Sequence, residues 1–559
     1  MRILLTVTVL FLLTACQSGQ PAYDVIIRHG MIYDGNGGEP YTGDIGINGD
    51  SIAFIGDLSK ARGKQEVDAA GKAVAPGFIN MLSWANQSLI ADGRSQSDIR
   101  QGVTLEVMGE GESMGPLNAR MAEQLKNGQR DIQYPVSWHT LGGYLRFLEQ
   151  KGVSCNVASF VGATTIRDYV IGEDDRAPTP AELDSMRKLV REAMQEGAMG
   201  VGSSLIYPPA FFAKTDELIA LCQEASAAGG MYISHMRNEG NKLFEAVQEL
   251  ITIAREARIP AEIYHLKAAG KDNWWKIDSL IAIVEAARRE GLAITADMYT
   301  YHASATGLTA AFPPSLQDGG FDKLWKRLQD PAIRASMKKA MNSNPQEWEN
   351  TYHGAGGAEG VLLLGFRHDS LRKYVGKTLA EVAKLRNQSP EETAMDLIVE
   401  DSSRIDVSYF SMSADNVKKE VGIPWMSFCS DASSSSAEGL FLKSHPHPRA
   451  YGTFVRVLGK FARDEKALRL PDAIRKLSKL PATNLKLKRR GELRTGYFAD
   501  IVVFDPATVQ DHATFAEPHQ YATGVSDVLV NGVQVLKNGE HTGATPGRFV
   551  KGPGYVPAN

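Results

Sequence analysis

Two short apolar runs, each followed by a histidine, decide the fold: Met231-Tyr-Ile-Ser234 before His235, and Ala261-Glu-Ile-Tyr264 before His265. Runs of this length predict buried strands. The segment 242–257 between them has apolar residues at helical spacing. Two strands joined by a helix form a βαβ unit, which predicts a parallel sheet or barrel.

The same alternation continues on both sides of this unit. Upstream, Thr179-Pro-Ala-Glu182 combines a capping hydroxyl, a first-turn proline and a glutamate three residues later, which predicts a helix start. A strand near 198–202 and a helix over 216–228 follow it, and a helix over 274–289 and a strand over 293–298 lie downstream. Repetition at about one unit per 30 residues indicates an α/β fold.

Both ends of the chain instead contain short strands joined by Asn-Gly turns. The turn at Asn48-Gly49 joins expected strands over 44–47 and 51–55, and Asn531-Gly532 joins a second pair near the C-terminus. Asn-Gly between two strands favours a tight hairpin. Because the termini of a domain often lie close together, we expect one small composite β-sandwich built from both ends.

Composition excludes several classes of function. The 559 residues include 61 basic and 65 acidic side chains, for a net charge of −4, which is too balanced for binding nucleic acid. Apolar residues make up 43% of the chain, as in ordinary globular proteins. Cys155, Cys222 and Cys429 show no paired spacing, which argues against a disulfide scaffold or a thiolate zinc site.

The N-terminus resembles an export signal. Arg2 precedes the apolar run 3–13, and Leu13-Thr-Ala-Cys16 resembles the bacterial lipobox. We expect a signal peptide over 1–15, lipidation of Cys16, a tether over 16–22, and a lipoprotein of the bacterial cell envelope that faces the periplasm. The alternative is an ordinary secretory signal with an incidental cysteine. No later run reaches about 18 apolar residues, so the only expected membrane contact is the lipid anchor.

Polar residues follow several of the expected strands. His235 and His265 follow strands one βα unit apart, and Asp431 follows the apolar stretch 423–429. In barrels such positions meet at one face, so the two imidazoles are placed to bind one metal ion. For Asp431, a helix N-cap before 433–436 is the alternative.

Nearly the whole mature chain resembles the N-acyl-D-amino-acid deacylases, or D-aminoacylases, of the amidohydrolase superfamily. The motifs that carry the resemblance are Ala75-Pro-Gly-Phe-Ile79, Gln101-Gly-Val-Thr104, Leu205-Ile-Tyr-Pro-Pro209, His235-Met-Arg-Asn-Glu-Gly240, His265-Leu-Lys-Ala-Ala-Gly270, His447-Pro-Arg-Ala-Tyr-Gly-Thr-Phe454, Ala499-Asp-Ile-Val-Val-Phe-Asp505, Glu517-Pro-His-Gln-Tyr521 and Val530-Asn-Gly532.

The resemblance implies a TIM-like (β/α)8 metallo-dependent hydrolase barrel with a small β-sandwich domain. We expect the barrel over 77–484, with an insertion at about 322–415 that is either a lid or a set of peripheral helices. The two parts of the β-sandwich are expected over 23–76 and 485–559.

The chain departs from the family pattern at two places. Where the family has Asp-x-His-x-His, this sequence reads Asn80-Met-Leu-Ser-Trp84, so one metal subsite is expected to be absent. Where the family has a metal-ligating cysteine, alignment on the neighbouring glycine and serine places Glu110, and a carboxylate can replace the thiolate. Glu112 is the competing candidate, and a solvated acidic loop is the alternative to both.

We therefore expect one zinc ion bound by Glu110, His235 and His265, with Asp431 as the general base that deprotonates a metal-bound water. The resemblance also implies that Arg449 and Tyr301 bind the substrate carboxylate, and the role of Lys267 stays open. The expected substrate is a small N-acyl-D-amino acid, hydrolysed to a carboxylate and a free D-amino acid. The alternatives are hydrolysis of a cyclic amide or a D-residue dipeptide, or an inactive ligand-binding lipoprotein.

Overall fold

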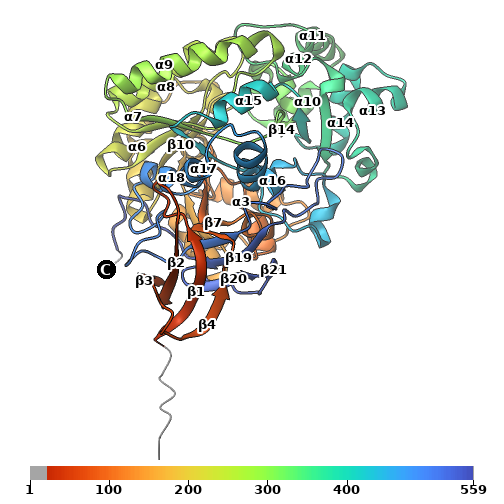
Figure 1. The fold of residues 1–559 in the computed structure, drawn as a ribbon. Coiled ribbons are helices and arrows are strands. Elements are labelled where there is room, and N and C mark those ends of the chain that lie inside the picture. The colour runs from red at the N-terminus through yellow and green to blue at the C-terminus, as the bar shows by residue number, and fades with distance from the viewer. Residues whose placement is uncertain (1–21, 558–559) are drawn as a thin grey trace, which may run out of the picture.

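The structure is a computed structural model that describes residues 22–557 and has a mixed α/β architecture (Figure 1). The predicted signal peptide and Cys16 lie outside the described residues. No helix among the described residues combines the length and apolar character needed to cross a membrane.

Strands from both ends of the chain share one nine-stranded sheet. Its hydrogen-bonded order is β21-β20-β19-β18-β5-β1-β2-β3, and β4 pairs with β1. Figure 1 shows the N-terminal strands beside the C-terminal ones below the rest of the molecule. The bounds are β1 (Tyr23–Ile32), β2 (Tyr41–Asn48), β3 (Ser51–Gly56), β4 (Gly63–Asp68), β5 (Ala73–Pro76), β18 (Ile501–Phe504), β19 (Val525–Val530), β20 (Val533–Lys537) and β21 (Glu540–His541). Both predicted Asn-Gly hairpins are confirmed, as β2-β3 and β19-β20.

Two parallel sheets form the centre of the chain. One has the order β17-β13-β12-β11-β10-β9, and the other has the order β6-β7-β8. Strands β8 and β9 are separated by Phe160 alone, and the amide of Met81 donates to the carbonyl of Phe428 at the other edges. The bounds are β6 (Phe78–Asn80), β7 (Val103–Met108), β8 (Asn156–Ser159), β9 (Val161–Gly162), β10 (Gly200–Ser204), β11 (Met231–His235), β12 (Ala261–Ile263), β13 (Ile294–Met298) and β17 (Met426–Phe428).

Helices follow these strands and bury their apolar faces in one large core. Their bounds are α1 (Ser88–Ala91), α2 (Gln96–Ile99), α3 (Ala119–Asn127), α4 (Leu141–Lys151), α5 (Ala163–Val170), α6 (Pro180–Glu196), α7 (Thr215–Ala227), α8 (Leu243–Glu256), α9 (Ile277–Arg289), α15 (Ala414–Val421), α16 (Arg449–Arg456), α17 (Leu470–Leu477) and α18 (Lys479–Asn484). The predicted start of α6 is confirmed, because Thr179 and Glu182 form a reciprocal capping box. The helix predicted from residue 274 begins three residues later, since a 3₁₀ turn spans Lys271–Lys276.

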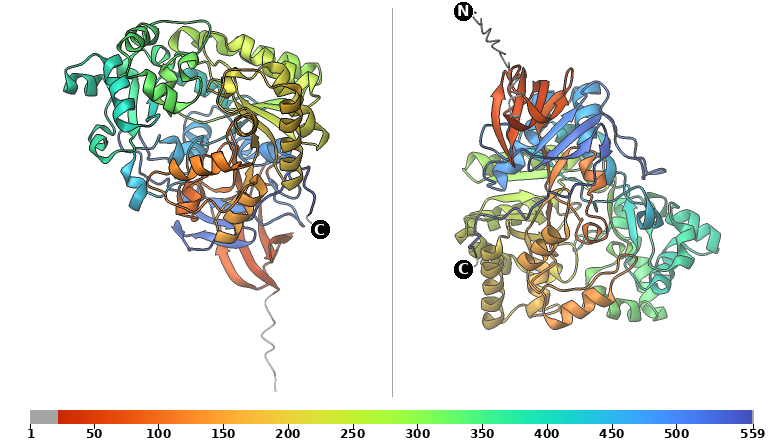
Figure 2. Two further views of the ribbon diagram at one scale, coloured as in Figure 1. Left: turned by 180° about the vertical axis from the view of Figure 1, so that it is seen from behind. Right: turned by 90° about the horizontal axis from the view of Figure 1, so that it is seen from below.

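An inserted lobe has a hydrophobic core of its own, formed by residues between Leu308 and Tyr409. It comprises β14 (Ser304–Gly307), β15 (Val361–Gly365), β16 (Asp406–Tyr409), α10 (Phe321–Arg327), α11 (Pro331–Met341), α12 (Thr351–Gly354), α13 (Leu379–Arg386) and α14 (Pro390–Asp401). Figure 2 shows this lobe beside the parallel strands and away from the sheet of the chain ends. It begins before the predicted residue 322, because β14 directly follows the segment after β13 and pairs with β16.

Candidate metal centre and active site

Three side chains that the sequence nominated as metal ligands lie together at the carboxyl ends of parallel strands. Glu110 follows β7, His235 ends β11 and His265 follows β12. Gly109 turns the chain after β7 with φ 105°, and a Cβ there would lie 2.3 Å from the carbonyl oxygen of Phe160. Only glycine fits this turn without strain, and the turn directs Glu110 toward the histidines.

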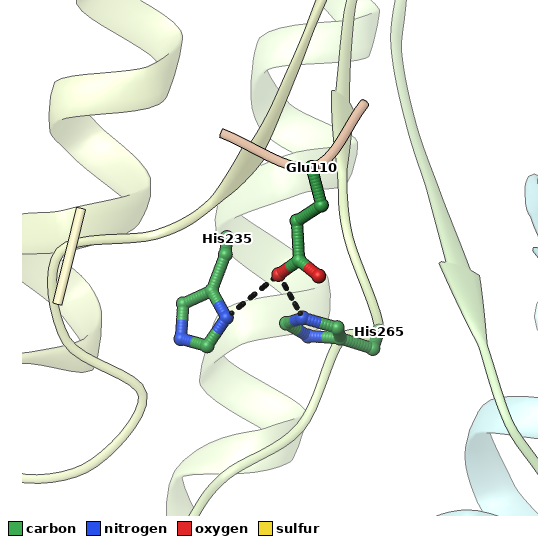
Figure 3. Close-up of side chains that lie close together, drawn as sticks. All are labelled: Glu110, His235 and His265. Atoms are coloured by element: carbon green, nitrogen blue, oxygen red, sulfur yellow. Dashed lines mark hydrogen bonds and ion pairs between the residues drawn. The ribbon is translucent and has the colours of Figure 1, made fainter. Parts of the chain in front are cut away.

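The three side chains converge on Glu110 (Figure 3). Glu110 Oε1 lies 3.0 Å from His235 Nδ1 and 3.0 Å from His265 Nε2. The candidate ligand atoms of the three residues all lie within 4.8 Å of one another, and all three side chains are buried. Glu112, the competing candidate, is outside this group, so the structure favours Glu110.

The donor set fits a divalent cation. One carboxylate and two imidazoles are the ligands of many catalytic zinc sites. Although burial opposes it, the charges of His265 and His235 hold the pKa of Glu110 well below its usual range. Burial and Lys267 lower the pKa of His265, but the Glu239 and Glu110 carboxylates outweigh them and raise it to about 10. This pocket therefore favours positive charge between the three side chains.

A second set of charged groups supports the histidines. Glu239 Oε1 lies 3.1 Å from His265 Nδ1, and Glu239 Oε2 lies 3.8 Å from His235 Nε2. Lys267 Nζ donates to both oxygens of Glu239 at 2.8 and 2.9 Å, and the backbone amide of Glu239 donates to Glu349 Oε2 at 2.5 Å. A carboxylate that accepts from the distal nitrogen of a ligating histidine fixes its orientation. Sequence reasoning gave Glu239 no role, although it lies four residues after His235 in a quoted motif.

Two of the site residues have strained backbones. His265 has φ 34° and Asp431 has φ 47°, in the left-handed region that non-glycine residues rarely adopt. The amide of His265 donates to Asp297 Oδ1 at 2.7 Å, and the amide of Asp431 donates to the carbonyl of Leu82 at 2.9 Å. These hydrogen bonds hold both residues in place, and strain of this kind is common at functional sites.

Asp431 is buried beside Arg449, and Arg449 Nη1 lies 2.7 Å from Asp431 Oδ2. Burial raises the pKa of the Asp431 carboxyl and the Glu110 charge adds to the rise, while Arg449 opposes it. Residues 433–436 form no helix in this structure, so the N-cap alternative for Asp431 is wrong.

The sequence departure at residues 80–84 places an indole in the site. Trp84 Nε1 donates to Glu110 Oε2 at 3.0 Å and to Asp431 Oδ1 at 3.1 Å. Leu82 is completely buried and apolar. In this chain residues 80–84 therefore contribute a hydrogen-bond donor, the Trp84 indole. Neither Leu82 nor Trp84 offers an atom that could bind a metal ion.

Tyr301 does not lie where a substrate-binding residue is expected. Its hydroxyl donates to Asp511 Oδ2 at 3.2 Å, and the guanidinium of Arg456 lies 4.6 Å from its ring centroid. Tyr299 lines the cavity instead, and the guanidinium of Arg449 stacks 4.4 Å from the Tyr299 ring centroid. The chain leaves β13 at Met298 and turns, so nearby tyrosines reach different surroundings.

A cavity of about 1250 Å³ contains these groups. Glu110, Asp431, Arg449 and Lys267 line it, and so does Glu112. The inserted lobe forms part of the wall through residues 304–307, Asn344, Glu349 and Arg404. The lobe therefore contributes to the wall of the cavity.

Comparisons with known proteins agree with this geometry. The model of the amidohydrolase family matches residues 65–536. The chain is 33% identical to a D-aminoacylase of Alcaligenes xylosoxydans xylosoxydans over 537 residues, which is 96% of this chain and 99% of that protein.

Two solved structures are similar over 95% of this chain. One is a D-aminoacylase with a binuclear metal centre, for which one-metal activation and second-metal attenuation are described; it is 30% identical, with a TM-score of 0.78 over all of that chain. The other is an N-acyl-D-glutamate deacylase of Bordetella bronchiseptica with zinc and a phosphonate mimic of the tetrahedral intermediate; it is 28% identical, with a TM-score of 0.79 over 99% of that chain.

Proposed function

The chain belongs to the amidohydrolase family, and from that premise we propose that it is a zinc-dependent hydrolase of N-acyl-D-amino acids. The products would be a carboxylate and a free D-amino acid. The observation that carries this proposal is the convergence of Glu110, His235 and His265 next to the buried Asp431 and Arg449. The activities of the similar D-aminoacylase and deacylases support the substrate class.

We propose that Glu110 Oε1, His235 Nδ1 and His265 Nε2 hold a single zinc ion per chain. Zinc bound there would polarise the scissile carbonyl and lower the pKa of a water toward about 7. Glu239 would keep the His265 imidazole oriented toward the ion through its other nitrogen, and its negative charge faces His235 Nε2 at 3.8 Å. His235 Nε2 has no hydrogen-bond partner among the described residues.

We assign the general base to Asp431. Each oxygen of a carboxylate can accept two hydrogen bonds, so Asp431 Oδ1 and Oδ2 each keep one free acceptor site beyond Trp84 and Arg449. Its raised pKa brings it nearer to neutrality, where a base both accepts and returns a proton efficiently. Asp431 would take a proton from the attacking water and deliver it to the leaving amine.

Arg449 and Tyr299 would bind the substrate carboxylate, with Tyr299 in place of Tyr301. Arg449 Nε has no hydrogen-bond partner among residues 22–557, so its guanidinium keeps a free donor. The face of the Tyr299 ring orients this guanidinium. A planar guanidinium with spare donors suits a carboxylate, which it can bind through two parallel hydrogen bonds. Lys267 Nζ donates to both oxygens of Glu239 and lies 2.7 Å from His265 Nδ1, so its three donors are occupied beside the histidines.

We further propose that the two parallel sheets are arcs of one (β/α)8 barrel. The near continuity of β8 and β9 supports closure on one side. The hydrogen bond from Met81 to Phe428 and the bridge between Ser83 and Ala432 support it on the other.

We also propose a lipid anchor at Cys16 in the bacterial cell envelope. Its support is the lipobox-like Leu13-Thr-Ala-Cys16 after an apolar run. Expression of Cys16→Ser should release the protein from the membrane fraction. Recovery of this variant in the membrane at the wild-type level would contradict the anchor.

The deciding experiment assays purified protein with matched N-acetyl-D- and N-acetyl-L-amino acids, beside elemental analysis by mass spectrometry. We expect release of acetate from D-substrates only, with about one zinc per chain. Hydrolysis of a D-residue dipeptide or a cyclic amide in place of these substrates would move the protein to another reaction of the family. A zinc-loaded protein that binds these substrates without turnover would be a ligand-binding protein.

A further inference from the structure

Trp84 lies between two buried carboxylates that would otherwise repel each other. Its Nε1–H donates at 3.0 Å to Glu110 Oε2 and at 3.1 Å to Asp431 Oδ1. The remaining oxygens point to other partners, since Glu110 Oε1 faces the histidines and Asp431 Oδ2 faces Arg449. One N–H group therefore joins the candidate ligand set to the candidate base.

An N–H group and a metal ion are alternatives at this position. Two facing carboxylates are usually held together by a shared proton, a donor or a cation. A cation between Glu110 Oε2 and Asp431 Oδ1 would need further ligands at about 2.0–2.2 Å. The indole nitrogen is a donor without a lone pair for a metal, and Leu82, two residues earlier, is apolar and wholly buried.

We propose that the Trp84 N–H replaces a second cation between Glu110 and Asp431. It limits the centre to one ion and acts as a positioning residue for Asp431. This inference rests on the proposed zinc-dependent hydrolase. It makes the centre intrinsically insensitive to excess zinc, in contrast to the second-metal attenuation described for the similar D-aminoacylase.

The first test counts metal ions directly. Wild type, Trp84→His and the double variant Leu82→His/Trp84→His are incubated with excess zinc, desalted and analysed by elemental mass spectrometry. We expect about one zinc in wild type and about two where histidine joins Glu110 and Asp431 as a third ligand. Two ions in wild type, or one ion in both histidine variants, would overturn the inference and leave the proposed hydrolase standing. No zinc in wild type would instead defeat the proposed function, and with it the inference.

The second test removes only the N–H. Trp84→Phe keeps an aromatic ring but leaves both carboxylates without this donor. We expect about one zinc per chain, an unchanged KM and a kcat lower by roughly tenfold, because a hydrogen bond to a charged group is lost at the base. An unchanged kcat would overturn the positioning role.

Matched controls use Trp275, whose side chain is 66% exposed. Trp275→His and Trp275→Phe make the same chemical changes away from the cavity, and both should keep one zinc and wild-type kinetics.

In an activity titration with zinc, Trp84→His should acquire inhibition by excess metal. The absence of inhibition in a variant that holds two ions would contradict the predicted zinc sensitivity.

Discussion

At the scale of single residues, Glu239 links the two histidines to the positive charge of Lys267. We expect Glu239→Gln to weaken zinc binding by about 10–100-fold, because the neutral amide removes the negative charge that holds His265 at 3.1 Å and faces His235 at 3.8 Å. Competition with a chelating dye measures this affinity. Glu290→Gln, at an exposed ion pair, is the matched control and should bind zinc as wild type does.

Glu239→Gln also leaves the buried Lys267 ammonium without the carboxylate that neutralises its charge. The double variant Glu239→Gln/Lys267→Met removes that charge. If support of the histidines is the cause, zinc binding stays weak in the double variant. Recovery of wild-type affinity would instead assign the effect to the unpaired ammonium.

A substitution of Asp431 distinguishes a role in the chemical step from a role in metal binding. We expect Asp431→Asn to keep about one zinc per chain while kcat falls by about 10²–10⁴-fold, since an amide cannot accept the proton. In wild type, kcat should decline as the pH falls through the raised pKa of Asp431, because the protonated carboxyl is no longer a base. Loss of zinc from Asp431→Asn would show that this residue is a metal ligand.

At the scale of elements, the strands and helices with clear periodicity were predictable because their signals are local. β11, β12 and α8 lie within a few residues of their predicted bounds, and α6 begins where its capping residues predict. The contacts of Trp84 were not predictable, because its two acceptors lie 26 and 347 residues away in the sequence. The sequence showed that two histidines were missing and could not show what replaces them.

The sequence also could not predict which of two neighbouring loop side chains enters the site. The sequence offered both Glu110 and Glu112, and the backbone turn at Gly109 decides which one meets the histidines. It also favoured Tyr301, whereas the turn after β13 brings Tyr299 to the cavity. Loop dihedrals of this kind leave no periodic pattern, whereas strand-end positions such as His235 and His265 follow from the fold class.

The interior of β12 carries a buried carboxyl with consequences for stability. Glu262 is fully buried and accepts from Thr295 Oγ1 at 2.6 Å and Asn484 Nδ2 at 2.8 Å. Burial raises the pKa of Glu262 to about 8, and the Asp297 charge adds to the rise. The folded state thus retains a proton that the unfolded chain loses near pH 4. Its stabilising contribution is complete below that pH and disappears as pH rises through about 8.

We therefore expect the Tm of wild type to fall between pH 5 and pH 8, and that of Glu262→Gln to fall less, because the amide does not ionise. Thermal unfolding followed by circular dichroism at closely spaced pH values measures both slopes. The exposed Glu290→Gln should keep the wild-type slope. Equal slopes in wild type and Glu262→Gln would refute the assignment of a raised pKa to this carboxyl.

At the scale of the whole molecule, the candidate ligands connect the ends of three strands, so ion binding and global stability are coupled. An ion that binds only the folded state at 100 times its Kd adds about 2.7 kcal/mol to the free energy of unfolding. For a chain of this size that corresponds to a Tm rise of a few degrees. We expect zinc to produce this rise in the metal-free protein, and Glu110→Ala to abolish it.

Glu112→Ala is the sharpest control, because Glu112 lines the same cavity outside the group of three and should leave the zinc response intact. If Glu112→Ala abolished the rise and Glu110→Ala preserved it, the carboxylate ligand would be Glu112, and the position of Trp84 would have to be interpreted without a metal beside it.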